Sequence, residues 1–595
     1  MSPESSRPTA SVVRERPALG GRGGWAVLAL LVALGLAIRL HGIAFLSPHL
    51  MEPDGLVVDY QMRALEGRGP ETTDHALYAY YPHLVASVAT LIPESWVAPA
   101  EPRTLDEHLA SAGSVRIRGR VAVALLSLLA IPLTWWLTRR FLPDPWALLA
   151  AALVAGSPFV VWFAQQARPH AATASFVLLA TCAAVHLRAR GGWRAYVFAG
   201  LAAGLAVGSL QNGIAALGPI GIAVLLRWRV DRARILAGFL AILAITAAFV
   251  VWLYPFLFVG GDGDGVGVAA DGTLGLSRHH VFLNLFNGRG FAVVWRTLID
   301  YDPLLTAGAL LGLAAAAVAP LVLREKLGPE RARDLAIILA YALPYFVVIG
   351  LYQRTYQRFV LPLTPFLAIL AAFGLWTAAR AAGRASPRLG RAVAIFAFVL
   401  GAAELAWGWR LGTVRARVDT IQEATAWLAA HATPGVDVID VMPGLDLPVV
   451  RTPESVARDS FQKNEQSLPW FRRLSDPSGA RIDSPAYDLR WMPLFEDAVR
   501  RQVRTDPDGF VRSLEGRYAV VVVWPEGVRP ALRILRDGLA RQYERVARFS
   551  PDDPDVGEDM PLVHQDDEMP YTTPWAWRIL SARCVGPTVE IYRLR

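Results

Sequence analysis

Two carboxylates follow closely on the first long apolar run of this 595-residue chain. Glu52 and Asp54 lie shortly after the run 25–46, and Tyr81 begins an aromatic-Pro-x-Leu stretch further along. A carboxylate at a membrane surface is well placed to take a proton from an acceptor hydroxyl group. The same acidic residues could instead be solvated loop charges, or could cap a following helix. The residue types make this segment a candidate general base, with both alternatives open.

Basic residues that could accompany this base occur in two later segments. Arg168 is followed by His170, and Arg354 and Arg358 precede a late apolar run. A guanidinium group offers a planar fork that binds phosphate in a bidentate manner. The same arginines could instead snorkel from helix ends to the membrane interface. His170 could contact an acceptor or a phosphate, or its hydrogen bonds could be satisfied by the backbone.

The elements that must position these residues are helices in a lipid bilayer. Hydrophobic residues make up 54% of the chain and charged residues 18%, against about 25% charged residues in soluble proteins. A spanning helix needs about 20 apolar residues, which predicts about eleven transmembrane helices. The count is least certain between 145 and 227, where tight Gly and Pro turns separate short runs. The runs lie at 25–46, 120–141, 145–164, 171–187, 195–210, 213–227, 235–258, 303–323, 335–352, 359–379 and 391–410.

Arginine placement predicts the orientation of these helices. Arg clusters occupy alternate loops and the opposite short loops carry few, so the positive-inside rule places the N-terminus in the cytoplasm. The alternation supports an odd number of spans, which puts the region after Arg410 outside. The predicted parts are a cytoplasmic tail (1–24), a transmembrane domain (25–410) with outer loops 47–118 and 259–302, and an extracytoplasmic soluble domain (411–595).

The C-terminal part has the pattern of a small α/β domain. Its predicted helices are 420–430 and 530–543, and its predicted strands are 436–441, 518–524 and 589–594. The fold class is therefore a mainly α, polytopic membrane protein with a small C-terminal α/β domain. Two cysteines, Cys182 in an apolar run and Cys584 near the C-terminus, indicate neither a disulfide nor a thiolate metal site. The net charge of +8 does not indicate a nucleic-acid partner, because the basic residues sit between apolar runs.

The order of these motifs resembles that of the GT-C superfamily of membrane glycosyltransferases. The group it resembles contains the protein mannosyltransferases, the aminoarabinose transferases and the RgtA/B/C/D-like enzymes. Each motif is weak alone, and their order and their side of the membrane make the combination more specific. Over roughly 25–440, the resemblance is carried by the acidic pair with the Tyr81 stretch, by 165–170, by 358–363 and by 419–435.

The resemblance implies a reaction at the outer face of the cytoplasmic membrane. Its donor is a polyprenyl- or dolichyl-phosphate sugar, and its acceptor is an unknown glycan, lipid or protein. Asp54 is then the general base, alone or with Glu52, because Gly55 stands where many relatives carry a second acidic residue. The arginines, His170 and Tyr81 bind the substrates. No cofactor is implied, and a divalent metal is not favoured because the loop at 165–170 has no carboxylate.

Two other functions compete with this interpretation. A transporter or flippase of a lipid-linked sugar would show repeated halves, broken helices and intramembrane charges. Few such charges are found, with Glu404 the clearest, and no matching halves. A membrane-anchored interaction protein would need only one or two spans.

Overall fold

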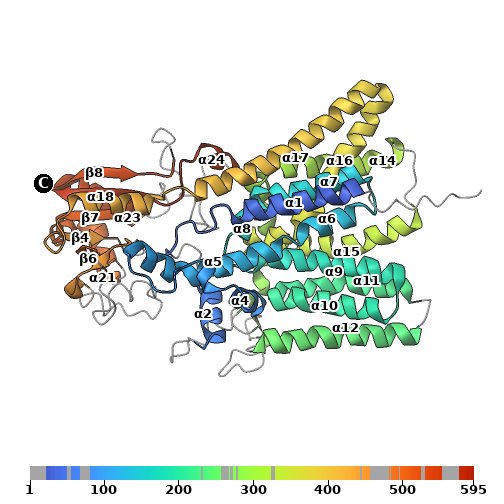
Figure 1. Cartoon of the computed structure of the whole chain (residues 1–595), viewed down its shortest axis with the longest axis horizontal. Coiled ribbons are helices and arrows are strands. Elements are labelled where there is room, and N and C mark those ends of the chain that lie inside the picture. The colour runs from blue at the N-terminus through green and yellow to red at the C-terminus, as the bar shows by residue number, and fades with distance from the viewer. Residues whose placement is uncertain are drawn as a thin grey trace, which may run out of the picture.

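The structure of this protein is a computed structural model with a helical bundle and a mixed sheet beyond one end of it (Figure 1). Glu52 and Asp54 fall outside the residues that the structure describes. These are 22–49, 55–67, 81–228, 232–255, 267–268, 273–276, 279–322, 328–442, 445, 447–455, 482, 484–494, 496–523, 530–552 and 575–595.

The bundle makes this a multi-span membrane protein. Over the described ranges, seven helices are long and apolar enough to cross a membrane, or up to nine spans if each bent helix pair is one span. The helices of the bundle are α1 (Arg22–Leu40), α5 (Leu105–Ser127), α6 (Ala130–Thr138), α7 (Asp144–Gly156), α8 (Pro158–Ala164), α9 (His170–Arg190), α10 (Trp193–Ser209), α11 (Leu217–Arg227), α12 (Arg232–Leu253), α13 (Gly290–Tyr301), α14 (Pro303–Val322), α15 (Pro329–Leu351), α16 (Thr364–Ala385) and α17 (Pro387–Arg415).

The predicted count of about eleven spans is not confirmed, although each predicted apolar run contains a helix. Helix α10 has 17 residues, and the next apolar helix, 211–225, is also short. The run 145–164 is broken into α7 and α8, which are bent by 50°, and α13 meets α14 at 119°. Hydropathy locates the apolar runs, and local breaks decide how many of them cross as single helices.

Short elements occupy the predicted outer loops. The first loop contains α2 (Gly55–Leu65), α4 (Leu84–Thr90), η1 (Glu94–Trp96) and the start of α5. The second contains β1 (Gly267–Val268), β2 (Thr273–Leu276), β3 (His279–Phe282) and η4 (Leu283–Leu285) before α13. Two more 3-10 turns, η2 (Gln211–Ala216) and η5 (Gln357–Leu363), join bundle helices. Helices α2 and α4 lie at the end of the bundle that carries the sheet (Figure 1).

The C-terminal elements confirm the predicted α/β class. Six strands pair in the order β5-β6-β4-β7-β9-β8, parallel from β5 to β7 and antiparallel from β7 to β8. Strand β7 is an almost fully buried apolar run, as expected for a strand covered on both faces. The elements are α18 (Thr420–His431), β4 (Val438–Val441), β5 (Val450–Arg451), β6 (Ala486–Trp491), α21 (Asp497–Thr505), α22 (Pro507–Arg512), β7 (Tyr518–Val523), α23 (Pro530–Gln542), β8 (Tyr543–Phe549), α24 (Trp575–Ser581) and β9 (Thr588–Leu594).

Helix α17 joins the bundle to the C-terminal elements. The indole Nε1 of Trp407 donates to the carbonyl of Ala576 on α24 at 3.0 Å. One turn later, Arg410 donates to the carbonyl of Ala582 at 2.7 Å. Asp419 then caps α18 by accepting from two backbone amides of its first turn at 2.9 Å each. The connection is therefore a packed and hydrogen-bonded one.

An ion-pair cluster lies where three predicted cytoplasmic loops meet. Asp334 on α15 is buried and accepts from Arg140 Nε and from Arg188 Nε at 2.9 Å each. Arg188 also binds Glu330 at 2.6 Å. One carboxylate on α15 thus joins Arg140, just after α6, to Arg188 in the last turn of α9, so these three helix ends lie together.

Candidate functional site

Three segments that the sequence singled out meet in an aromatic cluster of Tyr81, His170 and Phe359. The ring of Tyr81 meets that of His170 edge-on, with centroids 6.0 Å apart and planes at 87°. His170 also stacks with Phe359, with ring centroids 5.9 Å apart and ring planes at 29°. The rings come from the first predicted outer loop, from the start of α9 and from η5. The fold therefore brings together residues that are far apart in the sequence.

Tyr81 is held in this cluster by the helix that follows the predicted base. Gln61 on α2 donates from Nε2 to the carbonyl of Tyr81 at 2.7 Å. The Tyr81 side chain is buried and packs with Val57, also on α2, and with Leu210. Helix α2 begins at Gly55, directly after Asp54 in the sequence. The position of Tyr81 is therefore tied to that of α2.

Phe359 is held by a hydrogen-bonded chain from the opposite side. The hydroxyl of Tyr345 on α15 donates to the carbonyl of Phe359 at 2.9 Å. The same hydroxyl accepts from Asn212 Nδ2 of η2 at 3.2 Å. These two bonds fasten η5 to α15 and η2, which fixes the ring that stacks on His170.

The predicted arginines are placed differently. The guanidinium of Arg358 lies 4.2 Å from the ring centroid of Tyr356 and 5.5 Å from that of Phe359, so it adjoins the aromatic cluster. Arg168 is buried in the turn between α8 and α9, two residues before His170. Arg354 is exposed and lies over the ring of Phe282 at 4.6 Å, beside β3. Ring contacts link Arg358 to the cluster, and Arg168 is close to it along the chain, whereas the ring contact of Arg354 is with Phe282.

Arg116 is a buried residue that the sequence did not single out. From α5, its Nη2 binds Asp59 Oδ2 on α2 at 2.7 Å. Its Nη1 donates to the carbonyl of His49 at 2.7 Å and to that of Pro48 at 3.4 Å. One guanidinium thus holds both described flanks of the segment 50–54, which contains the two predicted carboxylates. The role of those carboxylates stays a prediction, because they lie outside the described residues.

Two further buried arginines extend this attachment along α5. Arg120 donates to the carbonyls of Ile43 and Phe45 at 2.9 and 2.8 Å. Arg118 forms an ion pair with Glu66, just after α2, and its Nη2 donates to the carbonyl of Thr90 at 3.4 Å. The sequence signal was an Arg-x-Arg-x-Arg run directly before an apolar stretch.

His49 has an altered proton affinity in this environment. It is buried, and burial together with the nearby charge of Arg116 lowers the pKa of the imidazole to about 4. Both causes disfavour the imidazolium form. His49 is therefore neutral at physiological pH and supplies no cation to the candidate site.

The described part of the chain holds no group of three or more His, Cys, Asp or Glu side chains arranged to bind a metal ion. The paired residues His279 and His280 lie in β3. The candidate site, as far as it is described, is thus a largely buried cluster of aromatic and cationic side chains.

Comparison with known families supports the predicted resemblance. Residues 109–256 match the family model described as dolichyl-phosphate-mannose-protein mannosyltransferase. The match covers less than half of the chain, and it includes Arg168 and His170 but only the end (109–118) of the first predicted outer loop. No curated protein matches the chain. The resemblance to the GT-C group, predicted from motif order, is confirmed at this level.

Solved structures of three membrane glycosyltransferases are similar over long stretches. ArnT from Cupriavidus metallidurans in the apo state shares 17% identity, covering 89% of this chain and 96% of that one, with a TM-score of 0.43. The oligosaccharyltransferase AglB from Archaeoglobus fulgidus, with an inhibitory peptide and a dolichol-phosphate, shares 12% identity over 89% and 73%, with a TM-score of 0.44. The Pmt1-Pmt2 complex of S. cerevisiae, bound to the sugar donor, shares 16% over 42% and 36%, at 0.31. Each TM-score is below 0.5, so these likenesses assign neither substrate nor mechanism.

Proposed function

We propose that this protein is an integral membrane glycosyltransferase that moves a sugar from a polyprenyl-phosphate donor to an acceptor at the outer face of the cytoplasmic membrane. The observation that carries the proposal is the convergence of Tyr81, His170 and Phe359. Each belongs to a separate motif of the predicted resemblance, and a chance resemblance would not require the three motifs to meet. The family match over 109–256 supports the same class.

In the proposed reaction, Asp54 takes the proton of an acceptor hydroxyl, alone or with Glu52 as a second carboxylate. The hydroxyl oxygen attacks the anomeric carbon of the sugar, and the bond between that carbon and the phosphate oxygen breaks. The polyprenyl phosphate leaves with the electron pair, and the configuration at the anomeric carbon inverts. The Arg116 contacts with Asp59 and His49 support this assignment, because they fix both flanks of the segment that carries the base.

The leaving phosphate needs positive charge. Arg358 and Arg168 are the proposed contacts, because one adjoins Phe359 and the other precedes His170 in the same turn. A guanidinium that stacks on aromatic rings keeps its fork oriented at little entropic cost. Arg354 is the weaker candidate, since its guanidinium lies over Phe282 beside β3.

The proposed orientation places the N-terminus in the cytoplasm and residues 411–595 outside. Asp334 joins three loops that the arginine pattern assigns to the cytoplasm. The aromatic cluster joins three segments that the same pattern assigns to the outer face. Both groupings agree with the predicted alternation of inner and outer loops. A span missed between 145 and 190 would place members of one group on opposite sides of the membrane.

A second candidate function is transport of a lipid-linked sugar across the membrane. The observation in its favour is the pair of bent spans, α7 with α8 and α13 with α14, because transporters often build their binding sites from broken helices. In that case the lipid carrier would cross the membrane with its sugar still attached.

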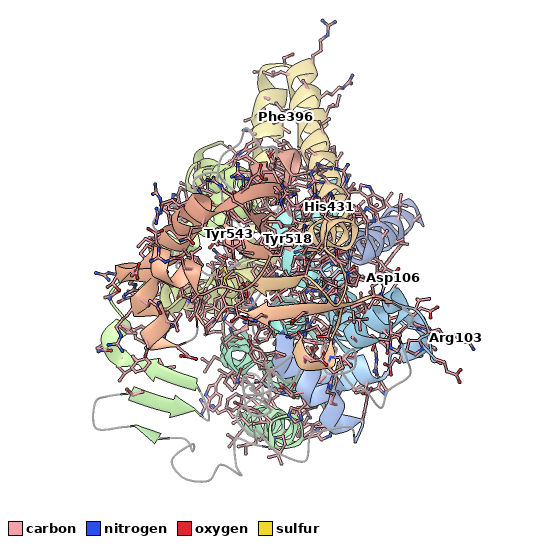
Figure 2. All side chains as sticks on the ribbon, turned by 90° about the vertical axis from the view of Figure 1, so that its left-hand side faces the viewer. Arg103, Asp106, Phe396, His431, Tyr518 and Tyr543 are labelled. Carbon is pink, nitrogen blue, oxygen red and sulfur yellow. The ribbon has the colours of Figure 1, made fainter. Side chains whose placement is uncertain are left out.

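The deciding experiment uses cells that lack the gene, complemented with wild type, with Asp54→Asn or with Asp106→Asn. Asp106 is a matched control, because it is an exposed aspartate in the first turn of α5, at the rim of the molecule (Figure 2). Mass spectrometry of envelope glycans, lipids and glycoproteins should show one sugar lost with Asp54→Asn and retained with Asp106→Asn. Full retention with Asp54→Asn at wild-type protein levels would remove the proposed base.

The purified full-length protein in proteoliposomes separates the two functions. The proteoliposomes are loaded with the polyprenyl-phosphate sugars extracted from the same membranes. A glycosyltransferase then releases free polyprenyl phosphate and glycosylates acceptors in an added membrane extract. A transporter instead moves the intact lipid between leaflets and releases none.

A further inference from the structure

Two carboxyl groups lie side by side inside the bundle where two spans break. Asp302 is the residue between α13 and α14, which meet at 119°, and Glu404 is on α17. The two side chains are 1% and 0% exposed and lie within hydrogen-bonding reach of each other. Ser157, the residue between α7 and α8, donates to Asp302 Oδ2 at 2.5 Å. Both breaks and α17 therefore meet at one polar point in an apolar interior.

The two carboxyl groups differ in the hydrogen bonds they receive. Asp302 accepts from the hydroxyl of Ser157 and from the backbone amide of Leu305, the latter at 3.1 Å. Neither oxygen of Glu404 has a hydrogen-bond partner of normal geometry in the described ranges, and the backbone donor that acts on it, the amide of Leu305, already bonds Asp302. A buried polar group without a partner costs free energy, so the unbonded Glu404 carboxyl points to a bound species that supplies the missing bond.

No cation of the described chain neutralises the pair. Arg39 on α1 is directed instead to the carbonyls of Val154 and Ala155 on α7, at 3.4 and 3.1 Å. The elements packed around the pair carry other charged side chains. In the described ranges, none of these acts on either carboxyl. These residues are Asp144 on α7, Arg296 and Asp300 on α13, Glu330, Arg331, Arg333 and Asp334 on α15, Arg358 on η5, Arg380 and Arg384 on α16, Arg388, Arg391, Arg410 and Arg415 on α17, and Arg578 on α24.

Charge energetics then determine what occupies the site. Two carboxylates about 4 Å apart repel each other by about 4 kcal/mol even at an effective dielectric constant of about 20. Burial of each unpaired charge costs several kcal/mol more. One proton between the groups removes the repulsion and supplies the hydrogen bond that Glu404 lacks. Asp302 already accepts two hydrogen bonds, which favour its ionised form.

We propose that Asp302 and Glu404 form a buried proton-binding site, in which the carboxylic acid of Glu404 donates to the carboxylate of Asp302. This bond fastens α17 to both broken spans. Trp407 and Arg410, on the next two turns of α17, bind the carbonyls of Ala576 and Ala582 at the C-terminal elements. The proton thus stabilises the part of α17 that carries the contact between the bundle and α24. The site does not depend on the proposed glycosyltransferase activity.

A hydrophobic carbodiimide, dicyclohexylcarbodiimide, tests the site because it reacts with protonated carboxyl groups in apolar surroundings. The probe is applied to the full-length protein in liposomes at neutral pH, and adducts are located by peptide mass spectrometry. Glu404 should carry the adduct. Asp334 is the matched control, because it is equally buried but paired with Arg140 and Arg188, and it should stay unmodified. Labelling of Glu404 should fall as the pH is raised and should vanish in Glu404→Gln.

Infrared difference spectroscopy provides a measurement that does not depend on access of the reagent. The C=O stretch of a protonated carboxyl should be present in the wild type and lost in Glu404→Gln, whose amide keeps the hydrogen bond to Asp302. Absence of that band from the wild type at neutral pH would overturn the proposal. Protection of Glu404 from the carbodiimide by Na⁺ but not by choline would overturn it as well, because the occupant would then be a metal cation.

Discussion

His49 should make the first outer loop sensitive to acid. Its folded-state pKa of about 4 lies below the ordinary value of 6.5. Between about pH 6.5 and pH 4 the opened loop binds a proton on His49 while the folded loop does not. The stability that this residue contributes is therefore complete above about pH 6.5 and is lost as the pH falls toward 4.

The size of the effect follows from the two pKa values. A difference of about 2.5 units corresponds to about 3 kcal/mol when the titration is complete. At pH 5, where the opened state is almost fully protonated and the folded state is not, the loss is about 2 kcal/mol. That loss is a factor of about 30 in the equilibrium between closed and open loop. Because His49 is fully buried, solvent screening does not reduce this value.

Hydrogen–deuterium exchange of 43–49 in nanodiscs, at pH 7.5 and pH 5, measures this equilibrium. After correction for intrinsic rates, acid should increase opening about 30-fold more in wild type than in His49→Gln, which has no titrating group at this position. His186→Gln removes an exposed histidine and should respond as the wild type does. An equal acid response in wild type and His49→Gln would refute the assignment of acid sensitivity to this imidazole.

Three further outcomes follow from the described contacts. Arg116→Met should lower stability by about 3–5 kcal/mol, because it breaks the buried ion pair with Asp59; the double variant with Asp59→Leu should recover part of the loss in thermal unfolding, and no recovery would contradict the pairing. Asp334→Asn should cost about 3 kcal/mol, because it breaks the buried ion pair with Arg188 and leaves that guanidinium with the exposed Glu330 as its carboxylate partner, and an unchanged unfolding midpoint would contradict that. Burial raises the pKa of Cys584 to about 12, so its thiol should resist maleimide at pH 8 in the folded protein and react after denaturation, as peptide mass spectrometry would show.

The C-terminal fold could be predicted where a local pattern determines the element. The apolar run 518–524 forms β7, and the amphipathic pattern 420–430 forms α18. Strand β5 was not predicted, because only two of its residues pair, and they pair with β6 rather than with a neighbour in sequence. Such a strand is defined by its partner, and no pattern of its own residues indicates it.

In the candidate site, the sequence identified the residues but not how they contact each other. Tyr81, His170 and Arg358 were selected by motif. Phe359 contacts both His170 and Arg358, but it had no predicted role of its own within the motif 358–363. The site was expected to contain charged groups acting on a phosphate. The structure adds the aromatic contacts and the Asn212–Tyr345 bonds that hold them, which depend on the packing of α15 and η2 and leave no local signal.

The burial of the α5 arginines could not be predicted from the sequence. Alternating Arg residues before an apolar run indicate the end of a water-exposed loop, and the predicted loop accordingly extended to 118. On a helix, however, residues four apart share a face and residues two apart do not. Arg116 and Arg120 therefore both reach the turn 43–49, while Arg118 reaches Glu66 and Thr90 on the other side. Helix α5 thus lies between the end of α1 and the α2–α4 pair, and its alternating charges bind the first outer loop from both faces. The sequence pattern is that of solvent-exposed arginines. In this fold the same arginines are buried and bind the loop that carries the predicted base.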